Sequence, residues 1–92
     1  MKTQITIKIS SRASSLFQLS IDDNVILKTN HPYEKSIEVL VEPGVKHILS
    51  WFIKGNEGEE YSIQITKPVE LPEEKAALGD EGMEIGQLKF TV

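Results

Sequence analysis

The feature that most constrains this chain is a regular alternation of apolar and polar residues. Between residues 3 and 9, isoleucine stands at every second position: Ile5, Ile7 and Ile9 alternate with Gln4, Thr6 and Lys8. Because successive side chains of an extended strand point to opposite faces, this period of two predicts a half-buried β-strand. Six further runs have strand character and lie between short segments rich in turn-forming residues: 17–21, 25–28, 37–41, 45–54, 61–66 and 87–92.

The spacing of these runs favours an all-β fold, an antiparallel β-sandwich or small barrel, and we expect a sandwich of about seven strands. No helix-length apolar pattern stands between the runs to make parallel crossovers. The 92 residues fit one domain spanning 1–92, because a chain of this length fills a single core. The run 45–54 is apolar on both faces, which predicts that it lies in the middle of the core.

The turns have their own signatures. Asp22, Asp23 and Asn24 suit a hairpin loop whose last residue takes a positive φ, and Pro43-Gly44 suits the centre of a type II turn. One short helical turn is expected over 72–79, because a proline stands near its start, carboxylates follow, and a glycine stands where a helix would stop.

The charge is unevenly distributed. The chain carries −4 overall, and its basic residues are scattered singly, which argues against nucleic acid as a partner. The segment 68–84 holds six carboxylates against one lysine and therefore carries −5, while the rest carries +1. We expect an acidic loop over 68–84 that is simply solvated; the alternative is a site for cations or for a basic partner protein.

The sequence offers no catalytic constellation. Without cysteine it has no disulfide, thiolate metal site or thiol nucleophile. His31 and His47 have no local partner; we expect His47 at a strand end near the sheet margin and a His31 ring nitrogen bonded to a nearby carbonyl. We therefore expect no enzyme and no cofactor. The chain as given has no signal peptide and no apolar run of roughly 18 residues, so we expect no membrane insertion, and its localisation stays open.

Two groups of residues are candidates for binding. Tyr33, Trp51 and Tyr61 would form a stacking platform for sugar rings if they shared one face, whereas a single tryptophan in the most apolar strand is more often a core anchor. Asp22 and Asp23 offer hard oxygen ligands for calcium, without the twelve-residue loop spacing that would make such a site specific.

One stretch carries a family resemblance. Residues 41–65 contain Glu42-Pro43-Gly44, then His47, then an alternating apolar strand. This resembles PEGA-type and related prealbumin-like or immunoglobulin-like bacterial accessory domains, and departs from their pattern in having Asp23-Asn24 where Asp-Gly is expected. The resemblance implies a non-catalytic spacer, adhesion or binding module, and it assigns no functional residue.

The leading hypothesis is therefore a non-catalytic interaction or accessory module that binds another protein or serves as a spacer. The alternative is a carbohydrate- or calcium-binding β-sandwich module. If the interaction surface is a sheet edge, the first and last runs are the expected edges, because an unpaired edge recruits partner strands.

Overall fold

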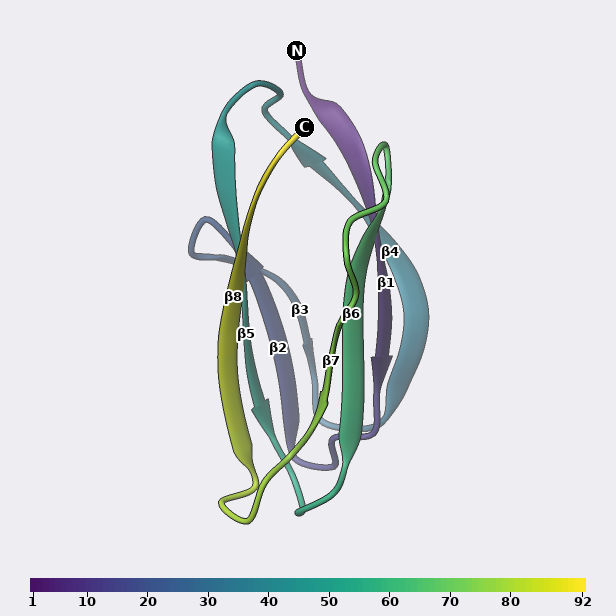
Figure 1. The fold of residues 1–92 in the computed structure, drawn as a ribbon, viewed down its shortest axis with the longest axis vertical. Helices are drawn as coiled ribbons and strands as arrows, with labels where there is room; N and C mark the ends of the chain where they lie inside the picture. The colour runs from purple at the N-terminus through teal and green to yellow at the C-terminus, as the bar shows by residue number, and fades with distance from the viewer.

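The computed structural model describes residues 1–92 and consists of eight β-strands without a helix (Figure 1). In chain order the strands are β1 (Thr3–Ser11), β2 (Leu16–Ile21), β3 (Asn24–Thr29), β4 (Tyr33–Val41), β5 (Lys46–Lys54), β6 (Glu60–Lys67), β7 (Glu74–Ala77) and β8 (Met83–Thr91). They form two four-stranded sheets: sheet A has the order β4-β1-β6-β7 and sheet B the order β3-β2-β5-β8. All neighbouring strands are antiparallel, as the alternation predicted.

The core lies between the two sheets and is built from the alternating residues. In sheet A, Ile7 of β1 stands between Ile37 of β4 and Ile65 of β6, and it is fully buried. In sheet B, Leu19 of β2 lies opposite Trp51 of β5, and both are buried. Burying one such side chain contributes about 1.5–3 kcal/mol, so the alternation fixes which face of each strand turns inward.

Strand β5 lies inside sheet B, but only one of its faces is in the core. Leu49 and Ile53 are fully buried, whereas Ile48 and Phe52 lie on the outer face, where Ile48 is exposed and Phe52 is half-buried. The prediction that this run lies in the middle of the core is therefore confirmed for its inner face and wrong for its apolar outer face.

The segment 72–79 is not helical. Residues Glu74–Ala77 form β7, which pairs with β6, and the following Leu78 is buried. A helix of eight residues has little stability in water, whereas pairing with β6 bonds the backbone and docks Leu78 in the core. The acidic segment 68–84 is accordingly not one loop, because it contains β7 and the first residues of β8, and the strands number eight.

The hairpin between β2 and β3 also differs from expectation. The positive φ angles belong to Asp22 (50°) and Asp23 (67°), while Asn24 already begins β3. Two residues in the left-handed region match a tight two-residue hairpin turn. In the turn before β5, Gly44 takes the positive φ (78°) expected after Pro43.

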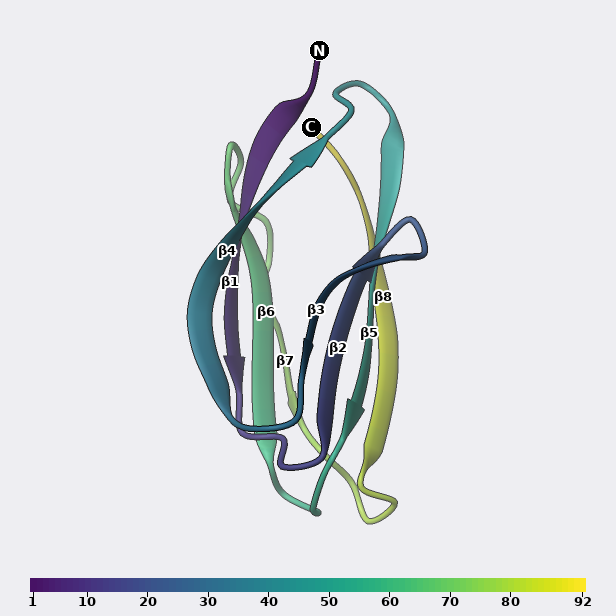
Figure 2. The same ribbon diagram turned by 180° about the vertical axis from the view of Figure 1, so that it is seen from behind.

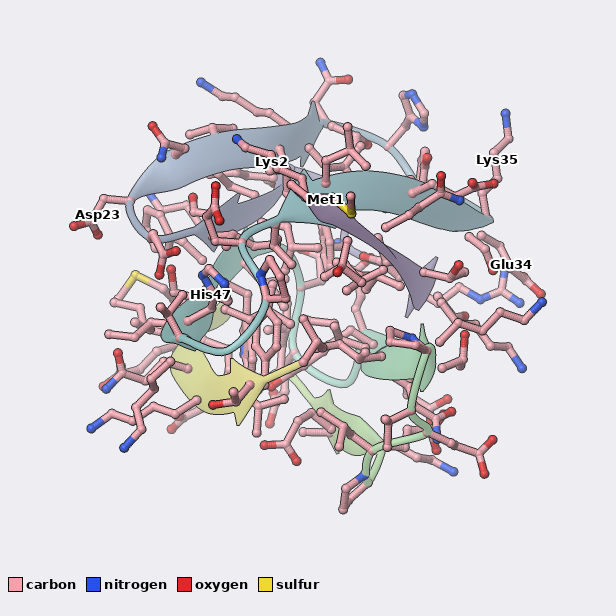
Figure 3. All side chains as sticks on the ribbon, turned by 90° about the horizontal axis from the view of Figure 1, so that it is seen from above. Met1, Lys2, Asp23, Glu34, Lys35 and His47 are labelled. Atoms are coloured by element: carbon pink, nitrogen blue, oxygen red, sulfur yellow. The ribbon has the colours of Figure 1, made fainter.

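Four strands lie at the sheet edges. Strands β3 and β4 form one side of the sandwich, and β7 and β8 form the opposite side (Figures 1 and 2). The view along the long axis shows the same arrangement, with β3 and β4 at one margin and β7 and β8 at the other (Figure 3). The last run of the sequence is thus an edge, as expected, whereas the first run, β1, lies inside sheet A.

Candidate functional site

The three aromatic candidates do not form an exposed platform. Trp51 and Tyr61 are each 6% exposed and belong to the core, and Tyr33 is half-buried at the start of β4. The Trp51 indole packs against Gly86 so closely that a Cβ at residue 86 would lie 2.5 Å from its Cζ2 and Nε1 atoms. Trp51 is therefore a core anchor. Burial raises the pKa of the Tyr61 phenol above its ordinary value.

The two aspartates proposed for calcium point in different directions. Asp23 points away from the molecule (Figure 3), whereas Asp22 turns toward His47. The Asp22 Oδ2 atom lies 2.6 Å from His47 Nδ1, and its Oδ1 accepts the Ile48 N–H at 2.9 Å. No three His, Asp or Glu side chains meet in a group that would hold a metal ion.

His47 is held between two acceptors. Its Nδ1 faces Asp22, and its Nε2 lies 2.6 Å from the Glu42 carbonyl oxygen, while the ring is 6% exposed and packs on Phe90. A neutral imidazole donates from one nitrogen only, so two acceptors favour the imidazolium. The Glu42 carbonyl and the Asp22 carboxylate accordingly raise the pKa of His47, and the hydrogen bonds from His47 and Ile48 lower that of Asp22.

This ion pair ties the β2–β3 hairpin to the start of β5. His47 lies near a strand end, as expected, but its partner Asp22 was not expected, because 25 residues separate the two in sequence. The register between β2 and β5 would have predicted this contact, because Ile21 pairs with Leu49 and Asp22 therefore lies at the beginning of β5. The expectation for His31 is confirmed, since its Nδ1 lies 2.9 Å from the Pro32 carbonyl oxygen.

The largest hollow in the surface lies at the end of sheet A where β6 begins. It measures about 640 Å³ and brings Arg12 and Lys75 together with Glu34, Glu60 and Glu73. Its charges are mixed, and the one aromatic residue at its wall, Tyr61, is buried. The hollow therefore does not indicate whether a ligand would be anionic or cationic, and it offers no aromatic surface for stacking.

The unpaired edge of β8 is a more specific feature. The Gly55 N–H donates to the Gly82 carbonyl and the Asp22 N–H to the Ile48 carbonyl, both at 2.9 Å. Since hydrogen-bonded and non-bonded pairs alternate along an antiparallel ladder, the even-numbered residues of β8 bond to β5. The backbone groups that face away from β5 belong to Met83, Ile85, Gln87, Lys89 and Thr91.

Side chains next to this free edge form an apolar outer surface. Ile85 is 70% and Met83 is 40% exposed, and Ile85 lies opposite Phe52 of β5. The Lys54 ammonium lies 5.5 Å from the centre of the Phe52 ring. We call Met83, Ile85 and Phe52 the outer apolar patch.

The sequence contained a signal for this surface that the strand expectations missed. In the first part of β8 the apolar residues are Met83 and Ile85, whereas in the second part they are Leu88 and Phe90, which have the opposite parity. β8 pairs with β5 without a bulge, so both sets cannot face inward. Leu88 and Phe90 take the interior, and Glu84 therefore faces inward while Met83 and Ile85 face solvent.

Comparisons of the chain with models of protein families, with curated proteins and with solved structures find no match. The structure contains no helix with the length and apolar character needed to span a membrane. Fold and site together define an all-β protein of two antiparallel sheets with four edge strands, of which β4 and β8 have nine residues each in regular register.

Proposed function

We propose that the protein is a non-catalytic interaction module that binds another protein through the free edge of β8. The observation that carries this proposal is the row of unpaired backbone groups along β8 beside the outer apolar patch. An extended segment of a partner gains main-chain hydrogen bonds by adding to such an edge, and neighbouring side chains provide specificity.

Comparison of the four edges supports β8 as the binding strand. Edges are normally protected by short strands, bulges, proline or charge. β7 has four residues and follows Pro72, β3 has six residues and an irregular register, and β4 presents Glu34 and Glu38 on its outer face. β8 has nine residues in regular register; it carries one outward charge, Lys89, and one inward charge, Glu84, which discourages pairing with uncharged strands.

The family of the β-sandwich is also part of this proposal. A prealbumin-like or immunoglobulin-like accessory domain of the PEGA kind is supported by the two antiparallel four-stranded sheets and by the Pro43-Gly44 turn ahead of β5. An accessory module of this kind needs no catalytic group, which agrees with a surface whose most distinct feature is an unpaired edge.

The experiment is a selection of displayed random nine-residue segments against the protein, with counter-selection against Gln87→Pro. Proline removes an N–H that makes no bond within sheet B, so we expect the variant to fold with nearly unchanged thermal stability. The matched control Gln87→Ala keeps the N–H and should bind as the wild type does. Segments that bind all three proteins equally, or no bound segment at all, would refute the proposal and leave the spacer role.

A further inference from the structure

We propose that the side of the sandwich between β7 and β8 binds a basic extended segment of another protein, which adds to β8 as a fifth strand of sheet B. In this segment apolar residues alternate with Lys or Arg. The inference rests on the function proposed above and adds the chemistry of the partner.

The two faces of β8 predict this alternation. A partner residue opposite Met83 or Ile85 would lie on the outer face and extend the outer apolar patch. A partner residue opposite Glu84 would point to the inner side, because side chains of paired strands share a face. Apolar pairs and pairs of opposite charge are favourable across neighbouring strands, so apolar residues suit the outer positions and cations the inner position opposite Glu84.

Two carboxylates on the inner side of the sandwich have no basic side chain beside them. Glu84 of β8 lies opposite the buried Ile53, and Glu74 of β7 lies opposite the buried Ile63. Both glutamates are half-buried. The one ion pair of the protein joins His47 and Asp22, so neither glutamate has a basic partner. An incoming Lys or Arg would pair with these carboxylates through charge-assisted hydrogen bonds.

A buried polar group lies on the same side. Trp51 Nε1 makes no hydrogen bond of ordinary geometry, although the Tyr61 hydroxyl lies beside it, and the indole packs against Gly86, the next inward-facing residue after Glu84. The inner side next to β8 thus combines two carboxylates without a basic partner and a buried indole N–H.

Charge favours a basic partner over a second copy of this chain. The segment 68–84, which runs along this side, carries −5, and the remainder of the chain carries +1. Pairing β8 with β8 of another copy would bring two such acidic sides together, whereas a basic segment would neutralise one. The inward Glu84 also disfavours uncharged strands, because it would remain unpaired beside them.

The test uses four synthetic nine-residue peptides, each acetylated and amidated. In three of them Val alternates with Lys, with Thr or with Glu. The fourth repeats the Lys peptide with alternate amides N-methylated, so that it keeps its charge and loses one hydrogen-bonding edge. Binding is measured by titration of the full chain, and the site by amide hydrogen exchange of residues 83, 85, 87, 89 and 91. We expect the Lys peptide to bind at least about tenfold more tightly than the Thr peptide and to protect these amides.

Two double variants distinguish the contribution of the inner carboxylates to binding from the contribution of the overall negative charge. Glu74→Gln with Glu84→Gln should weaken binding of the Lys peptide about tenfold and leave the Thr peptide unchanged. The control pair Asp80→Asn with Glu81→Gln removes the same charge from the β7–β8 turn and should weaken it about threefold or less. Equal weakening by both pairs would overturn the inner-site assignment.

The remaining outcomes separate this inference from the proposed function. Equal binding of the Lys, Thr and Glu peptides at β8 would overturn the charge inference while strand addition stands. Undiminished binding of the N-methylated peptide would overturn strand addition by the basic segment. A particle of twice the 10.3 kDa mass, abolished by Gln87→Pro, would show that a second copy is the occupant and overturn the inference. The inference would also be overturned if none of the four peptides bound and if the segments obtained in the display selection bound at β8 but contained no basic residues.

Discussion

The ion pair between Asp22 and His47 makes stability depend on pH in a defined way, and Asp22→Asn tests it. The side chain of asparagine would still accept the Ile48 N–H and tolerates the positive φ of residue 22. Its amide would donate to Nδ1 of a neutral His47, whose Nε2–H would bond to the Glu42 carbonyl. The substitution therefore removes the charge and keeps the hydrogen bonds.

The magnitude follows from the geometry of the pair. A hydrogen bond to a charged group contributes about 1.5–3 kcal/mol. The Asp22 side chain is 44% exposed, so water screens part of its charge, and we expect a loss of about 1–2 kcal/mol. With an unfolding entropy of about 2.1 cal/mol/K per residue, this corresponds to a fall in Tm of about 5–10 °C at pH 6.

The pH window follows from the directions of the two pKa shifts. The pKa of His47 is raised above 6.5 on folding, so its contribution is complete below pH 6.5 and is lost as the pH rises through the raised value. The pKa of Asp22 is lowered below 3.8, so its contribution is complete above pH 3.8 and is lost as the pH falls through the lowered value. The pair therefore stabilises the fold most between pH 3.8 and 6.5.

The measurement is thermal unfolding of the wild type and Asp22→Asn at several pH values from 5 to 9, together with NMR titration of His47 in a His31→Gln background. We expect the stability advantage of the wild type to shrink as the pH rises, and the pKa of His47 to fall in the variant. Identical pH profiles for the two proteins, or a His47 pKa unchanged by Asp22→Asn, would refute the reasoning.

Three further predictions concern packing and metal. Gly86→Ala should cost about 2–3 kcal/mol because its methyl group would overlap the Trp51 indole, whereas Gly79→Ala, with open space around it, should change stability by less than about 0.5 kcal/mol; chemical denaturation measures both. Phe17→Ala should cost about 3–5 kcal/mol because the ring is fully buried, and a loss below 1 kcal/mol would contradict its place in the core. Calcium at 1–10 mM should leave Tm unchanged, because both carboxylate oxygens of Asp22 are already bonded; a rise of several degrees would contradict this.

The sequence predicted the interior better than the edges, for a physical reason. Burial of alternate residues is a local property of each strand, so Ile5, Ile7 and Ile9 could be assigned to the core without knowledge of their neighbours. β7 could not be found in this way, because Glu74 and Lys75 carry no strand pattern and pair only because β6 offers an edge. The contact of Asp22 with His47 likewise depends on the β2–β5 register, which follows from the assembled sheet.

The candidate site arises where the local pattern and the assembled sheet conflict. The order Met83-Glu84-Ile85 by itself predicts a strand with its apolar residues inward, yet Leu88 and Phe90 on the same unbroken strand bury the opposite face. Two large apolar side chains therefore stay in water, which forgoes the stability that their burial would give, and one carboxylate faces inward. Such conflicts occur mainly where function compensates for them. The partner strand that we propose, with apolar outer and basic inner residues, would cover the two apolar side chains and pair with the carboxylate at the same time.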